Sequence, residues 1–254
     1  MKKALTIALF LCAVAVSAQT LVAPTCHNHG LKGPVHIVQT SWFYDTGDGY
    51  AIGNTGVEIY DTSGRLLHAL EMSQDGEDDN VHYTYDGLGR LSTETHTLGE
   101  PYTDAYHYGT DGRMVFIVRK FGEDYSQYDD TMRVRRYDSQ GRPVELMENG
   151  RPCLYRYWPN GEIRQVSEQK PNYNIYYNEY GQLDSVISQA GLLYYRFNSD
   201  GLMVSEDNHT GTFHFHSEFT DYIIDSHGNW INRSVNSNDG TKSFVRRTII
   251  YYKQ

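Results

Sequence analysis

A glycine-centred unit returns along this chain at intervals of about twenty residues, a period typical of repeat architectures in which each unit packs on its neighbours. Its clearest copies read Tyr-Asp-x-x-Gly-Arg, at residues 60–65, 85–90 and 137–142. The glycines that this unit assigns to turns are Gly64, Gly89, Gly112, Gly141, Gly161, Gly181, Gly201 and Gly228. The chain is therefore expected to fold as one array of similar units.

The local chemistry of the unit predicts a β-hairpin. An Asp or Asn three residues before a Gly favours a type I turn, because its side chain bonds the backbone ahead while Gly accepts the positive φ of the following bulge. Tyr83 and Tyr85 precede one such turn and share a face, since side chains alternate along a strand. No helical spacing of apolar residues interrupts the pattern. The sequence predicts an all-β fold: an antiparallel meander of stacked hairpins that forms a curved or partly closed sheet.

The Tyr-Asp pairs make the unit similar to the YD repeat of the RHS family, over residues 34–254. Large members of that family coil their repeats into a β-sheet shell around a toxic C-terminal polypeptide. The resemblance implies stacked hairpins here too, in a short member without a toxin domain. The segment 157–163 also resembles a MORN-variant repeat, another β-hairpin array.

The beginning of the chain predicts export. Lys2 and Lys3 precede an apolar run, and Val16-Ser17-Ala18 supplies the small residues of a signal-peptidase site. We expect a signal peptide at 1–18, the N-terminal segment of the mature protein at 19–33 and the repeat domain at 34–254. The mature protein would be secreted or periplasmic, associated with a bacterial cell envelope and without a membrane span.

Charge and cysteine content restrict the partners. The mature chain would carry 20 Lys and Arg against 32 Asp and Glu, a net charge of −12. Such a field repels phosphates, so we do not expect nucleic acid as a partner. Cys26 and Cys153 remain after processing. They could form a disulfide in an oxidising compartment or stay free, and the sequence does not decide between the two.

One segment places possible metal ligands in a row. His214, His216 and Glu218 alternate with Phe213 and Phe215, so a strand would project two imidazoles and a carboxylate from one face. The alternative is that the phenylalanines form the core row and the polar row only faces water.

A second candidate for a soft metal is the stretch Cys26-His27-Asn28-His29. Catalysis has no comparable support. Asp225, Ser226 and His227 are neighbours in one tight turn, where they cannot converge as a hydrolase triad. We therefore expect a protein that is not an enzyme and has no cofactor.

The tyrosines support two roles: rings can fill a core, or they can form a surface that binds a protein or a glycan. The residues considered for binding are Tyr155, Tyr157, Tyr176, Tyr177, Tyr194 and Tyr195. The functional hypothesis is a non-catalytic β-repeat scaffold or binding protein whose aromatic-rich sheet meets a protein or glycan partner. The alternative is a metal-binding exported protein, or a metal-dependent enzyme, that uses His214, His216 and Glu218.

Overall fold

The computed structural model describes residues 21–73, 79–98, 100–169 and 172–253, so the predicted signal peptide lies outside the described residues. Eighteen strands form one sheet. In chain order they are β1 (Val35–Asp45), β2 (Tyr50–Tyr60), β3 (Leu66–Met72), β4 (Asp79–Tyr85), β5 (Leu91–His96), β6 (Tyr102–Tyr108), β7 (Met114–Phe121), β8 (Asp130–Tyr137), β9 (Pro143–Glu148), β10 (Arg151–Tyr157), β11 (Ile163–Gln169), β12 (Asn172–Tyr177), β13 (Leu183–Ser188), β14 (Leu192–Phe197), β15 (Met203–Thr210), β16 (Phe213–Ile224), β17 (Trp230–Ser237) and β18 (Lys242–Tyr251). A short 3-10 helix, η2 (Glu123–Tyr128), lies between β7 and β8.

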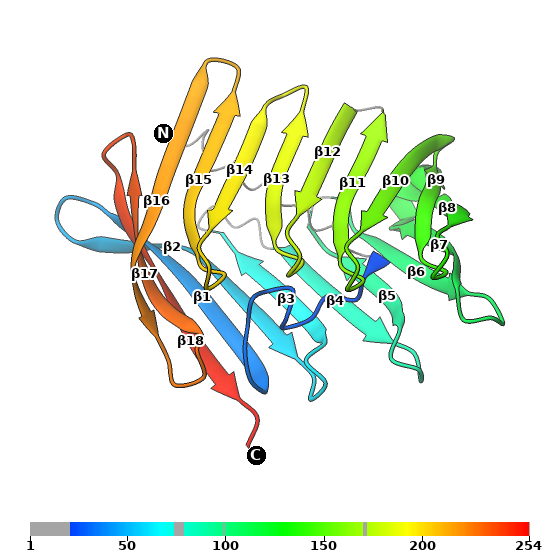
Figure 1. The fold of residues 1–254 in the computed structure, drawn as a ribbon, viewed down its shortest axis with the longest axis horizontal. Coiled ribbons are helices and arrows are strands. Elements are labelled where there is room, and N and C mark those ends of the chain that lie inside the picture. The colour runs from blue at the N-terminus through cyan, green and yellow to red at the C-terminus, as the bar shows by residue number, and fades with distance from the viewer. Residues whose placement is uncertain (1–20, 74–78, 99, 170–171, 254) are drawn as a thin grey trace.

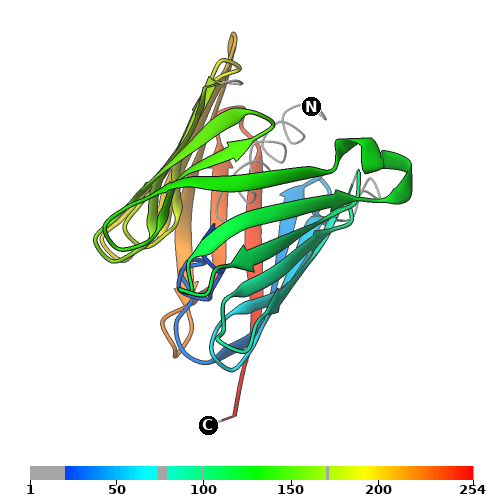
Figure 2. The ribbon, with the colours of Figure 1, turned by 90° about the vertical axis from the view of Figure 1, so that its right-hand side faces the viewer.

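The sheet closes on itself. Each strand pairs antiparallel with its sequence neighbour, and β18 returns to pair with β1, where Val38 lies opposite Ile249 on one side and Glu58 on the other. The strands consequently surround a common interior, with β2–β7 and β10–β15 as facing walls (Figures 1 and 2). The predicted all-β antiparallel meander is confirmed. The sheet is more closed than the predicted curved or partly closed sheet, because pairing of the first and last strands leaves no open edge.

The core lies inside the closed sheet. Tyr60, Val166, Ile175 and Leu193 have no exposed surface, and Tyr83 is 6% exposed. These side chains occupy inward positions of their strands, as the alternation along each strand requires. The predicted tyrosine rows are therefore mainly core rows.

The repeated motif forms a linked chain of contacts along one rim. The carboxylate of Asp61 accepts hydrogen bonds from the backbone N–H (2.9 Å) and the Nε–H (2.7 Å) of Arg65. The Arg65 guanidinium lies 4.6 Å from the centre of the Tyr85 ring in the next repeat. The Tyr85 hydroxyl in turn donates to the carbonyl of Leu66 at 2.7 Å. The charge pair thus holds the arginine within its own turn, while the cation–π contact and the tyrosine hydrogen bond join that hairpin to the next.

The same contacts recur where the motif is intact. Arg90 stacks on Tyr108 and Arg142 on Tyr157, at 4.0 and 4.5 Å from the ring centres. All eight glycines that the sequence assigned to turns have φ between +76° and +100°. The turn prediction is therefore confirmed at every copy, including those without Tyr-Asp.

Within the described residues, no helix has the length and apolar character needed to cross a lipid bilayer.

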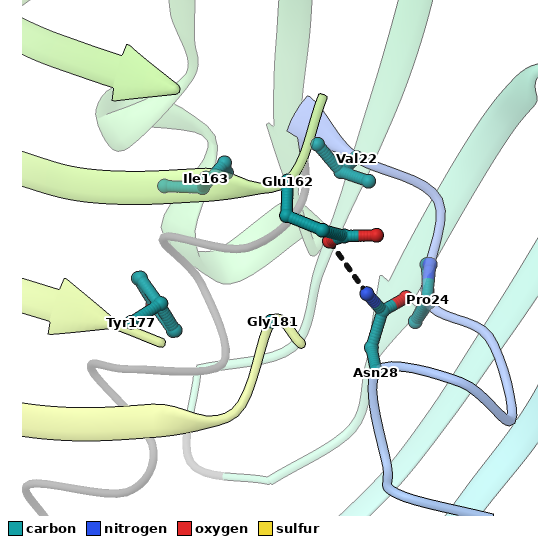
Figure 3. Close-up of a pocket in the computed structure, with 7 residues that line it drawn as sticks. All are labelled: Val22, Pro24, Asn28, Glu162, Ile163, Tyr177 and Gly181. Carbon is teal, nitrogen blue, oxygen red and sulfur yellow. Dashed lines mark hydrogen bonds between the residues drawn. The ribbon is translucent and has the colours of Figure 1, made fainter. Parts of the chain in front are cut away.

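Residues 21–33, which we call the plug, lie across the end of the closed sheet where the motif turns are. On one wall, the Cys26 N–H donates to the Gly64 carbonyl at 2.8 Å. On the opposite wall, the Asn28 amide donates to Glu162 at 2.7 Å (Figure 3). Figure 2 shows this dark blue segment between the two walls. The plug therefore joins hairpins that are distant in sequence.

The two cysteines do not pair. Cys26 of the plug and Cys153 of β10 are both buried free thiols, so the possible disulfide is not formed. Burial raises the pKa of Cys26 to about 11 and that of Cys153 to about 12. Both thiols are thereby kept protonated and unreactive at neutral pH.

Candidate functional site

The small space beneath the plug does not fit a ligand. Val22, Asn28, Glu162 and Tyr177 are among the residues that line it, and its volume is about 10 Å³ (Figure 3). That volume holds roughly one water molecule. We therefore regard this contact as part of the packing of the plug.

A charged cluster holds the middle of the plug to β2. The Nδ1 of His29 lies 2.7 Å from Glu58 and 3.0 Å from the Tyr60 hydroxyl, which donates to Glu58 at 2.9 Å. Burial raises the pKa of Glu58, but His29, Arg247 and Tyr60 outweigh this effect and lower it to about 2. Burial lowers the pKa of His29, and Glu58 outweighs it and raises that pKa above the ordinary 6.5.

These shifts predict a pH window for the stability of the plug. The depressed pKa of Glu58 stabilises the fold fully above the ordinary value of 4.5, and this contribution is lost as the pH falls toward 2. The raised pKa of His29 stabilises the fold fully below 6.5, and this contribution is lost as the pH rises through the raised value. Thermal melts of Glu58→Gln should therefore differ most from wild type between these two ordinary values. The exposed Glu123→Gln in η2 should follow the wild-type profile at every pH, and the same profile for Glu58→Gln would contradict the assignment.

Charges deeper in the interior are matched to one another. Arg119 donates to both oxygens of Asp104 at 2.8 Å, and Asp104 is 3% exposed. Glu94, which has no exposed surface, accepts hydrogen bonds from His96 at 2.7 Å and the Tyr106 hydroxyl at 2.9 Å. Buried and paired groups of this kind fix the interior packing and are not accessible to a ligand.

Most tyrosines proposed for binding are not available. Tyr155 and Tyr177 are buried in the core, and Tyr157 and Tyr195 pack against the core cluster from inward positions. The prediction that these four form a binding surface was wrong, because closure of the sheet turns their face inward. The other two, Tyr176 and Tyr194, lie on the outer face beside Ser185, which pairs with both.

A cleft of about 340 Å³ opens on the outer face over β17, β18 and the β1–β2 hairpin. These elements lie on the left in Figure 1. Its lining residues are Tyr50, Asn232, Ser234, Asn236, Lys242, Ser243, Phe244 and Arg246. They converge because outward positions of antiparallel strands lie opposite one another, as Asn236 does with Lys242 and Asn232 with Arg246. The volume is within the range of small-ligand sites.

The cleft combines aromatic faces with polar groups. The Phe244 ring stacks on Phe43 at 4.5 Å between ring centres and lies T-shaped to Tyr50 at 4.9 Å between centres, and Tyr50 is 57% exposed. Two cations and no carboxylate line the cleft. In the described part of the chain, the side chains of Lys242 and Arg246 form no ion pair. The arrangement can stack on a ring and bind an anionic group.

The histidines predicted as metal ligands lie on the outer face of the β15–β16 hairpin, at the top of Figure 1. His214 and His216 belong to a cluster there, but its other members are Asp207 and His209 of the neighbouring strand. Glu218 is 3.9 Å from His216 and its side chain is 65% exposed. The predicted row was therefore correct in its face and wrong in its partners, because successive outward residues on one strand are nearly 7 Å apart whereas opposed residues are about 5 Å apart.

The second soft-metal candidate is not assembled. Cys26 is buried beside Gly64, and His29 is engaged with Glu58. The only group of three or more possible ligands found among the described residues is Asp207, His209 and His214.

No protein-family model and no curated protein matches the sequence. Among solved structures, the chain is similar to a porin-like protein from Bacteroides uniformis, with 10% sequence identity and a TM-score of 0.42, over 86% of this chain and 99% of that one. So distant a likeness carries no information on the ligand or the location of this protein.

Proposed function

We propose that this is an exported, non-catalytic binding protein that recognises an acidic saccharide in the outer cleft. The observation that carries the proposal is the convergence of an exposed tyrosine ring, a half-buried phenylalanine ring, amides and two cations without ion pairs around a space of about 340 Å³. The closed sheet is the scaffold that holds these groups in place, because all of them lie on strands or on one hairpin.

Each lining group has a counterpart in a sugar. The face of Tyr50 offers a flat apolar surface for the C–H side of a pyranose ring. The side chains of Asn232, Ser234 and Asn236 make no hydrogen bond with other described residues, and they supply donors and acceptors for hydroxyl groups. Exposed polar groups around an aromatic platform are typical of sites that bind polar ligands reversibly.

The charge of the cleft favours an anion. The chain as a whole has a formal charge of −10, yet the cleft contributes Lys242 and Arg246 and no acid. By strand register two carboxylates lie beside the cleft without lining it, Glu218 opposite Asn236 and Asp45 opposite Tyr50. A carboxylate on the sugar would pair with the Arg246 guanidinium in a charge-assisted hydrogen bond. We therefore favour a uronic-acid unit over a neutral sugar.

We further propose that the outer surface faces water. Large apolar side chains such as Val166 and Ile175 point into the interior, whereas outward positions carry Arg133, Arg156 and Arg196, all exposed. Exposed arginines on an outer face are unfavourable against lipid, most of all near the middle of a strand, where Arg133 lies in β8. A water-facing outer surface agrees with an exported protein that meets saccharides in the envelope or outside the cell.

The test is a calorimetric titration of the mature chain with oligogalacturonate and with its methyl ester, which has the same rings without the charges. We expect binding of the acid and roughly tenfold weaker binding of the ester, the loss of one charge-assisted hydrogen bond. Arg246→Gln should weaken binding of the acid by a similar factor. Tyr50→Ala should weaken both ligands, because it removes the stacking surface.

The control is Arg156→Gln, which removes an exposed outward arginine from β10, a strand that pairs with β9 and β11 and not with the strands of the cleft. Its affinity should equal that of wild type. Absence of binding to both ligands, or equal losses in Arg156→Gln and Arg246→Gln, would refute the proposal. Release of shorter sugars during incubation would refute the non-catalytic part.

A further inference from the structure

We propose that Asp207, His209 and His214 form a site for a borderline divalent transition metal, such as Zn²⁺, Cu²⁺ or Ni²⁺, on the outer face of the β15–β16 hairpin. This site is separate from the saccharide cleft. One ligand atom from each of the three residues lies within 4.8 Å of the other two.

The strand register brings the three side chains together. His209 of β15 pairs directly with His214 of β16, and Asp207 pairs with His216 two positions along. The imidazole rings of His209 and His214 stack with 4.1 Å between their centres and an angle of 13°. The two rings already stand side by side at the edge of the Asp207 carboxylate.

The distances allow closure around an ion. His214 Nε2 is 3.5 Å from Asp207 Oδ1. A tetrahedral Zn²⁺ with bonds of about 2.0–2.1 Å holds its ligand atoms roughly 3.4 Å apart. Since no two of the ligand atoms are more than 4.8 Å apart, the excess over this spacing is at most about 1.4 Å, which rotation of exposed imidazoles supplies without movement of the strands. His209 and His214 are both exposed, so water can complete the coordination.

His216 acts as a positioning residue. Its Nδ1 lies 2.8 Å from Asp207 Oδ1, and the His216 side chain is 30% exposed. A histidine bonded to a ligating carboxylate fixes the orientation of that carboxylate, as outer-shell partners do in metal sites. Asp207 is thus held between His216 and His214, and it cannot turn away from the stacked pair.

The donor set determines the class of metal. Two imidazole nitrogens and one carboxylate oxygen suit Zn²⁺, Cu²⁺ and Ni²⁺, whereas Ca²⁺ and Mg²⁺ prefer all-oxygen sites. The protein also contains an internal comparison. His68 and His82 form another opposed pair on β3 and β4, with 4.2 Å between stacked rings, but the residue bonded to His68 is the amide of Asn80. If two stacked histidines were enough to bind the metal, the His68–His82 pair would bind it as well as the His209–His214 pair does.

The experiment uses the untagged mature chain, stripped of metal with a chelator and titrated with ZnCl₂ or NiCl₂ alone in a calorimeter. We expect one ion per chain. His214→Asn and Asp207→Asn should each reduce the affinity at least tenfold, and His216→Gln should reduce it less. His82→Asn, which breaks the comparison pair, should keep the wild-type affinity and stoichiometry. With Cu²⁺, the electron paramagnetic resonance spectrum should show coupling to two imidazole nitrogens, reduced to one in His209→Asn.

Thermal melts in chelator separate an effect on metal binding from an effect on folding. Because the substituted side chains point outward, the variants should have nearly the same stability as wild type when no metal is bound. The proposal is overturned by absence of stoichiometric binding, or by equal losses in His82→Asn and His214→Asn. It is also overturned by a copper spectrum without nitrogen coupling. None of these results affects the saccharide cleft, whose ligand is titrated in chelator.

Discussion

Gly191→Ala should destabilise the protein by about 3 kcal/mol or more, the cost of forcing atoms into a packed site without room to relax. Gly191 lies in the short connection between β13 and β14. A Cβ at this position would be 2.1 Å from the backbone carbonyl oxygen of His209 and 3.0 Å from the Cα of Thr210. Both obstacles are backbone atoms of the next strand, so no side-chain rotation relieves the clash. For a chain of this size the melting temperature should fall by roughly 6–12 °C.

Two other glycines separate the clash from ordinary glycine effects. A Cβ at Gly211 would meet nothing within 4 Å, but the backbone there has φ of +60°, so Gly211→Ala should cost only about 1 kcal/mol. Gly87 has neither a positive φ nor a close neighbour, and Gly87→Ala should be nearly neutral. In calorimetric melts, the loss of melting temperature should be largest for Gly191→Ala, intermediate for Gly211→Ala and smallest for Gly87→Ala. A Gly191→Ala protein as stable as Gly87→Ala would show that β14 and β15 do not approach as described.

The turns could be predicted from sequence because their chemistry is local. Asp61, Gly64 and Arg65 are within five positions of one another, and the turn needs nothing else to form. The inward tyrosine rows follow from strand alternation alone. Gly191 was not identified, because its close neighbour, His209, lies on another strand.

Closure could not be predicted because it depends on one distant pairing. Val38 pairs with Ile249, more than two hundred positions later in the chain. The twist and shear that bring the two strands together are properties of the whole sheet and cannot be deduced from the sequence of one repeat. The error on Tyr155 and Tyr177 followed from this, since an open sheet would have left one of its faces exposed. The predicted row of metal ligands was wrong for a related reason. The residues that join His214 in the cluster, Asp207 and His209, come from the adjacent strand, and the register between the two strands is set by the intervening turn.

The role of the plug was also missed by sequence analysis, because the segment has no periodic pattern and its contacts with the walls are distant in sequence. Asn229 shows this most clearly. It follows Gly228 directly, at the position where intact motifs carry Arg, and it is 2% exposed. Its side-chain oxygen accepts from the Lys32 N–H at 2.7 Å, and its Nδ2 donates to the Lys32 carbonyl at 2.8 Å and the Tyr251 hydroxyl at 2.7 Å.

Asn229→Ala should therefore destabilise the protein by about 2–3 kcal/mol, because it leaves the N–H and carbonyl of Lys32 without their partners. The plug should also open more often at this end. Lys32 is the only Lys or Arg in the plug, so limited trypsin digestion gives a specific signal: cleavage after Lys32 should become faster relative to wild type. Mass spectrometry of the released N-terminal peptide measures it directly.

Asn198→Ala is the matched control, since Asn198 is an exposed turn asparagine whose side-chain oxygen accepts from the N–H groups of Asp200 and Leu202, both at 3.0 Å and within its own turn. It should leave cleavage after Lys32 unchanged. If Asn229→Ala protects Lys32 as well as wild type does, the three hydrogen bonds do not hold the plug. Faster cleavage in both variants would instead indicate a general loosening of the turns. Faster cleavage in Asn229→Ala alone would show that this side chain fastens the plug to the β16–β17 turn.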